Sequence, residues 1–95
     1  WLHFGDDYHY LTLNDNGEGE ARDLRGHQPG VAHMGFITHN LDALVDRLAA
    51  AGFEVDHQGA KEQHRRNVYF IDPNGLEIEF VEYASDLPVQ RNLSS

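Results

Sequence analysis

The sequence has no cysteine, few basic residues and no long hydrophobic run, and each absence excludes a class of protein. Without cysteine there is no disulfide framework, thiolate zinc site, iron–sulfur cluster or cysteine nucleophile. Sixteen acidic residues against seven basic ones give a formal net charge of −9. We therefore expect neither nucleic acid nor an anionic membrane surface as a partner, because both require a basic face.

The sequence also shows neither a transmembrane segment nor a signal peptide. No apolar run approaches the ~20 residues of a transmembrane helix. The first residues lack the basic start and apolar stretch of a signal peptide. We therefore expect a cytoplasmic protein. The sequence starts at Trp1 and enters strand-like sequence at once, so we also expect further residues upstream of it.

The 95 residues have room for one small domain with a thin core. Residues 1–4 and 8–13 are rich in aromatic and β-compatible side chains and predict a hairpin that turns at Gly5–Asp7. Residues 14–30 are polar, with glycine and proline, and predict a long loop or linker.

From residue 31 onward the pattern predicts the order β-α-β-β-β and hence an α+β fold. Asn40 is a plausible helix N-cap and Gly52 a plausible end, and an apolar stripe with helical spacing lies between them. The strands are expected at four places: 31–38, 53–55, 67–71 and 76–83. A strong turn is expected at 72–75, a polar loop at 58–64 and a tail at 84–95.

Two side chains in these strands carry possible chemistry, namely His33 and Glu79. The helix stripe must cover an apolar sheet face, most simply that of Ile78 and Phe80, so Glu79 points to the opposite face. Glu77 is expected to be solvated. An imidazole and a carboxylate on one face suit a divalent transition metal, whereas an isolated His or Glu is ordinarily solvated or hydrogen-bonded. Spacing alone leaves both interpretations open.

Several stretches together resemble the glyoxalase / bleomycin-resistance / extradiol-dioxygenase superfamily, also called vicinal oxygen chelate proteins. They are Gly30–Phe36, Asn40–Leu44 and Arg66–Phe80. The most specific part is the Asp-Pro-Asn-Gly turn at 72–75 followed by Glu79. The opening residues 1–10 resemble the hairpin that ends the first module of such proteins.

The resemblance implies paired βαβββ modules whose sheets curve around a cup. Residues 1–13 would be the final hairpin of a first module that is N-terminally incomplete in this chain, and 14–30 the linker. Residues 31–83 would be a complete second module and 84–95 the tail. Because cups in this family are often built across chains, the resemblance also implies a homodimer.

Carried over by position, the resemblance makes His33 and Glu79 metal ligands, with Glu79 also at the catalytic centre. The ion would be Fe²⁺, Mn²⁺, Zn²⁺ or Ni²⁺, in a 2-His-1-carboxylate site whose further ligand comes from upstream of Trp1 or from a partner chain. Tyr10, Tyr69 and Arg66 would bind substrate. Tyr10 falls near the position where some members place a second Glu.

Two functions follow from the resemblance. The first is a metal-dependent enzyme (a lyase, dioxygenase or resistance transferase) whose ion chelates neighbouring oxygens of a small substrate. The alternative is a metal-free protein that binds a small molecule or antibiotic in an aromatic cup, where the acidic charge would favour cationic ligands.

Overall fold

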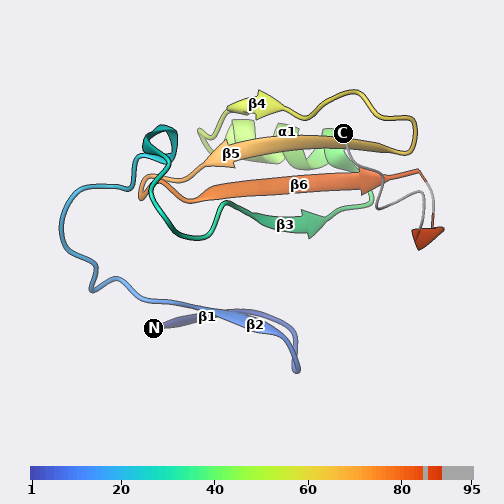
Figure 1. Cartoon of the computed structure of the whole chain (residues 1–95). Coiled ribbons are helices and arrows are strands. Elements are labelled where there is room, and N and C mark those ends of the chain that lie inside the picture. Colours follow the sequence, from blue (N-terminus) through green and yellow to red (C-terminus); the bar gives the residue numbers. More distant parts are fainter. Residues whose placement is uncertain (85, 89–95) are drawn as a thin grey trace.

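The computed structural model describes residues 1–84 and 86–88, and arranges this part of the chain in two β-sheets with one α-helix (Figure 1). The elements in chain order are β1 (Leu2–Gly5), β2 (Tyr10–Leu13), the 3-10 helix η1 (Leu24–Gly26), β3 (Met34–Ile37), α1 (Leu41–Ala50), β4 (His57–Gln58), β5 (Arg65–Ile71) and β6 (Glu77–Tyr83). The α+β class and the βαβββ order after residue 31 are as predicted. Most of the predicted tail lies outside the described residues.

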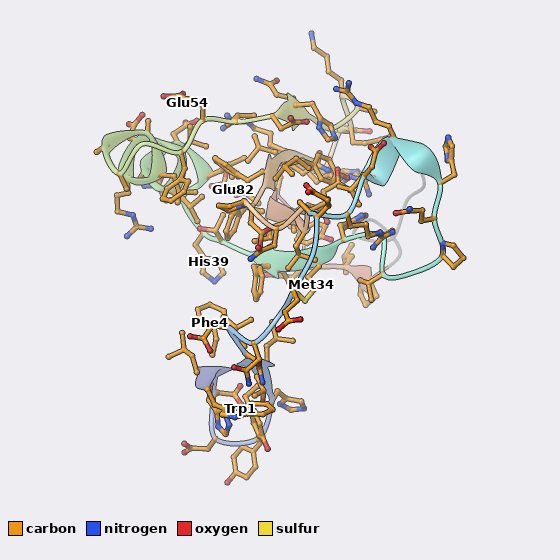
Figure 2. The ribbon with its side chains drawn as sticks, turned by 90° about the vertical axis from the view of Figure 1, so that its left-hand side faces the viewer. Trp1, Phe4, Met34, His39, Glu54 and Glu82 are labelled. Carbon is orange, nitrogen blue, oxygen red and sulfur yellow. The ribbon has the colours of Figure 1, made fainter. Side chains whose placement is uncertain are left out.

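The N-terminal hairpin forms a small sheet of its own. β1 pairs antiparallel with β2, with Phe4 opposite Leu11. The Asp6 carboxylate closes the turn, since it accepts hydrogen bonds from the backbone N–H groups of Tyr8 and His9 at 2.8 and 2.6 Å. Figure 2 shows Phe4 on the side of the hairpin that faces β3, where its ring meets Phe36 edge-on at 5.5 Å.

The larger sheet has the strand order β3-β6-β5-β4. β3 runs parallel to β6, and the other pairs are antiparallel. The predicted turn at 72–75 joins β5 to β6. Its geometry is fixed by Asp72, whose side chain accepts from the N–H groups of Asn74 and Leu76 at 2.8 Å each, and by Gly75, whose φ of +85° favours glycine.

Helix α1 covers one face of this sheet, as the apolar stripe predicts. Asn40 caps the helix by accepting from the Ala43 N–H at 3.1 Å, and Gly52 follows its end with a φ of +93°. Leu41 is 1% exposed and packs with Val68 and Phe70. Phe80 joins this cluster, so Glu79 belongs to the other face. No helix in residues 1–84 and 86–88 is long and apolar enough to cross a bilayer.

Two strands differ most from the prediction. The strand expected at 31–38 is only Met34–Ile37, the four residues in register with β6, and His33 lies directly before it. The strand expected at 53–55 lies instead at His57–Gln58. Backbone pairing with β5 begins there because the Asp56 N–H reaches the Tyr69 carbonyl at 2.8 Å.

The linker at 14–30 is anchored to the larger sheet at Arg22. The Arg22 backbone N–H donates to the Asn74 carbonyl at 3.4 Å, and its guanidinium donates to the carbonyls of Val31 and Gln28. The short helix η1 follows, capped by the Asp23 side chain, which accepts from the Arg25 N–H. This second half of the linker therefore lies against the turn that precedes β6.

Candidate metal and substrate site

His33 and Glu79 lie side by side on the sheet face that α1 leaves open. The parallel register places Gly35 opposite Glu79. His33, two positions before Gly35, therefore lies near the start of β6, where Glu77 and Glu79 are. The Nε2 atom of His33 lies 3.6 Å from Oε1 of Glu79. The Glu79 side chain is only 18% exposed. The structure thus brings together the two residues that the sequence singled out, while their metal role stays a prediction.

Two neighbours hold the Glu79 carboxylate in this position. A Cβ atom on Gly35 would lie 2.9 Å from Oε1 of Glu79, so glycine at this position leaves the carboxylate room to occupy its place over β3. The side-chain N–H of Asn67 donates to Oε2 at 2.7 Å. One carboxylate oxygen is therefore held by Asn67 and the other faces His33.

Tyr69, which was expected to bind substrate, lies within this cluster. Its ring meets His33 edge-on at 5.4 Å and stacks on His57 at 4.4 Å. Burial and the neighbouring charge of Glu79 raise the pKa of the Tyr69 hydroxyl. The phenol is therefore neutral near pH 7 and is a hydrogen-bond donor beside the carboxylate.

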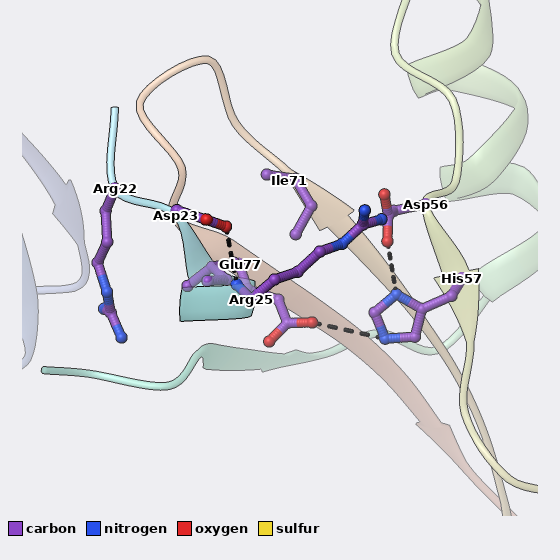
Figure 3. A pocket seen from close by; sticks show the side chains of 8 residues that line it. Arg22, Asp23, Arg25, Asp56, His57, Ile71 and Glu77 are labelled. Atoms are coloured by element: carbon purple, nitrogen blue, oxygen red, sulfur yellow. Dashed lines mark hydrogen bonds and ion pairs between the residues drawn. The ribbon is translucent and has the colours of Figure 1, made fainter. Parts of the chain in front are cut away.

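Glu77 was expected to be solvated, and this expectation is wrong. Its side chain is only 19% exposed, because two imidazole rings flank it. Oε2 lies 3.8 Å from Nδ1 of His33, and Oε1 lies 3.5 Å from Nε2 of His57. The second of these rings, His57, has its Nδ1 2.7 Å from the Asp56 carboxylate (Figure 3).

A hollow of about 640 Å³ borders Glu77 and His57 (Figure 3). Its other wall comes from the second half of the linker, with Arg22 and Arg25, and its floor includes Ile71. The linker therefore shapes a recess next to the His33–Glu79 pair. Because arginine and carboxylate groups alternate around it, this recess has no single charge preference.

Arg66, predicted to bind substrate, is not brought to this cluster. It alternates with Asn67 along β5 and so lies on the face that carries α1. There its guanidinium donates to the Asp42 carboxylate at 2.8 Å. This ion pair lowers the pKa of Asp42 and raises that of Arg66.

Tyr10, the other predicted substrate contact, lies in the hairpin and stacks on His3 at 4.7 Å. It borders a second hollow of about 610 Å³ between the hairpin and β3, together with Phe4, Met34 and Phe36. This hollow is lined mainly by apolar groups. The structure therefore separates the predicted substrate residues into three places.

The pair of donors suits a divalent ion. Metal–nitrogen and metal–oxygen bonds of about 2.0–2.2 Å place neighbouring donor atoms about 3.0–3.4 Å apart, close to the 3.6 Å between His33 and Glu79. In the described part of the chain, no three His, Asp or Glu side chains converge into a metal-binding group. His33 and Glu79 therefore fit as two ligands of a site that needs others.

Sequence reasoning missed Asn67, Glu77 and His57 as members of the cluster. Asn67 could have been found, because it shares the face of Tyr69 by strict alternation along one strand. His57 could not, since its position depends on the pairing of a two-residue strand with Tyr69.

Comparisons with known proteins agree with the architecture. The family model described as "Glyoxalase/Bleomycin resistance protein/Dioxygenase superfamily" matches residues 1–80. A glyoxalase family protein from Bacillus anthracis superimposes with a TM-score of 0.51 at 23% identity, over 78% of this chain and 52% of that one. The protein SMU.1112c gives a TM-score of 0.58 at 24% identity, over 75% and 54%. The chain thus spans about half the length of these structures. Among curated proteins there is no significant match.

Proposed function

Because this chain belongs to the glyoxalase/bleomycin resistance/dioxygenase superfamily, as its sequence predicts and the match over residues 1–80 shows, we propose that it acts as a metal-dependent enzyme. In this proposal His33 and Glu79 hold a divalent ion that chelates two neighbouring oxygens of a small substrate. The observation that supports it is the 3.6 Å approach of the His33 ring nitrogen to a carboxylate oxygen of Glu79.

The side chains around the pair have distinct tasks in this proposal. The ion, when bound, supplies a Lewis acid that polarises the substrate's oxygens. Asn67 fixes one oxygen of Glu79, so that the other is directed to the site. The Tyr69 hydroxyl keeps its proton beside Glu79, where it can be donated to this carboxylate or to the bound substrate. Candidate ions are Fe²⁺, Mn²⁺, Zn²⁺ and Ni²⁺, which imidazole and carboxylate ligands both accept.

The remaining ligands are proposed to come from a second copy of the chain or from a segment outside this sequence. A second copy is favoured by the larger sheet itself, in which β3 is an edge strand next to the pair. Sedimentation of the chain with and without metal tests this part. A monomer in both conditions contradicts a ligand from a second copy.

Metal binding tests the proposal directly. Calorimetric titration of the purified chain with each ion is expected to show binding that His33→Ala and Glu79→Ala each weaken at least about 10-fold. The matched controls are His27→Ala and Glu54→Ala, which remove the same groups from exposed positions. Equal binding by all five proteins, or no binding by the unmodified chain, overturns the proposal.

A second candidate function, metal-free ligand binding, is favoured by the hollow between the hairpin and β3. Its apolar lining includes the Phe4 and Phe36 rings, with Asp6 at its border. An aromatic recess in a chain of net charge −9 suits a cationic, apolar drug. Calorimetry with such drugs in the presence of a chelator tests this function, and binding that Phe4→Ala abolishes supports it.

A further inference from the structure

We infer that Glu77 is a positioning residue for His33, selecting the ring tautomer that presents Nε2 to a cation shared with Glu79. This inference rests on the proposed metal site and concerns a residue that does not itself contact the ion. It follows from how the two glutamates of one strand flank a single imidazole.

Positions 77 and 79 of β6 point to the same face, because side chains alternate along a strand. The His33 ring lies between them. Its Nδ1 faces Oε2 of Glu77 at 3.8 Å, and its Nε2 faces Oε1 of Glu79 at 3.6 Å. The two ring nitrogens of His33 therefore face two different carboxylates, Nδ1 toward Glu77 and Nε2 toward Glu79.

Glu77 is itself held by a second imidazole. Its Oε1 lies 3.5 Å from Nε2 of His57. The other nitrogen of His57 lies 2.7 Å from the Asp56 carboxylate, and its ring stacks on Tyr69 with an interplanar angle of 10°. A run of contacts thus leads from Asp56 through His57 to Glu77 and on to His33. The Glu77 carboxylate beside His33 is therefore held by neighbouring side chains and is largely shielded from solvent.

The chemistry assigns different roles to the two glutamates. A neutral imidazole has one N–H and one available lone pair on its ring nitrogens, and a metal-binding histidine ordinarily donates its N–H to a carboxylate, a backbone carbonyl or water. At 3.8 Å, a distance longer than a direct hydrogen bond, the negative charge of Glu77 favours an N–H on Nδ1. The lone pair is then on Nε2, directed toward Glu79, where a cation can join the two. The competing arrangement is an imidazolium with an N–H toward each carboxylate, which leaves no lone pair for a metal.

Substitution of Glu77 tests the inference through metal affinity. Glu77→Ala is expected to weaken Zn²⁺ binding about 10- to 100-fold, the usual effect of losing such a carboxylate. Glu77→Gln keeps the side-chain size and one acceptor oxygen, and its Zn²⁺ affinity is expected to lie between those of the unmodified chain and Glu77→Ala. Glu54→Ala removes the same charge from an exposed position and controls for the lower net charge. Unfolding midpoints show whether each variant is folded.

Nitrogen-15 NMR of the ring gives a second measurement that needs no metal. At about pH 8, His33 is expected to have its proton on Nδ1 in the unmodified chain. In Glu77→Ala it is expected to populate both tautomers. A proton on Nε2, or an imidazolium, in the unmodified chain overturns the inference.

The two measurements separate the inference from the function on which it rests. If the unmodified chain binds no Zn²⁺ yet shows the Nδ1–H form that Glu77→Ala abolishes, the metal site fails and the positioning role stands. If it binds Zn²⁺ and Glu77→Ala binds equally well, the positioning role fails and the metal site stands.

Discussion

The two sheets of this chain are built from similar aromatic hairpins but have very different surroundings. In the larger sheet, Phe70 is 7% exposed because α1 covers it, whereas Phe4 in the N-terminal hairpin is 54% exposed. An isolated two-stranded sheet is at best marginally stable in water. The comparison teaches that a strand pattern forms a core only where the chain also supplies a covering layer.

The largest expected difference between the two regions is in stability. Phe70→Ala is expected to lower the free energy of unfolding by about 3–5 kcal/mol, the usual cost of removing a buried phenyl ring. Phe4→Ala is expected to lower it by about 1 kcal/mol or less, since the residue is already 54% exposed and its ring meets Phe36 edge-on. Chemical denaturation followed by far-UV circular dichroism measures both. Similar losses in the two variants would mean that the hairpin is part of one cooperative core.

A smaller effect is expected at the glycines. Gly35→Ala places a Cβ atom 2.9 Å from Oε1 of Glu79, so the carboxylate must move and divalent-ion affinity is expected to fall about 10-fold. Gly17→Ala in the linker is the matched control, because nothing lies within 4 Å of its added Cβ. Calorimetric titration of the two variants measures the difference, and equal affinities would show that the carboxylate adjusts freely.

The smallest expected effect concerns acid stability. The pKa of Asp42 is lowered by Arg66, and that of Asp6 by the N–H groups of Tyr8 and His9. A lowered carboxyl pKa stabilises the folded chain above the ordinary value of 3.8, and this stability is lost as the pH falls through the folded pKa. Asp42→Asn is expected to make the free energy of unfolding of the whole chain fall slightly less steeply as the pH is lowered. Asp6→Asn is expected to change only amide hydrogen exchange in the hairpin. If Asp6→Asn changed the acid unfolding of the whole chain, the hairpin and the larger sheet would unfold as one cooperative unit.

The same comparison explains what could be predicted from sequence. The helix cap at Asn40 and the turn at Asp72–Gly75 depend on local patterns, which the sequence shows directly. The approach of His33 to Glu79 was expected from the family resemblance, because it depends on the parallel pairing of two strands that lie far apart in the sequence. The contact of His57 with Glu77 depends on a two-residue strand pairing with Tyr69. Its register is set by tertiary packing, so no local signal marks it. Arg66 illustrates the same limit, because its partner Asp42 belongs to a different element.

The attachment of Arg22 to Asn74 has a consequence for how the hairpin meets other surfaces. From that anchor, residues 14–21 reach at most about 28 Å when fully extended. A tether this short keeps the aromatic face of the hairpin at millimolar local concentration beside β3. A competing chain in dilute solution therefore has to bind the hairpin far more strongly than β3 does before it can draw the hairpin away.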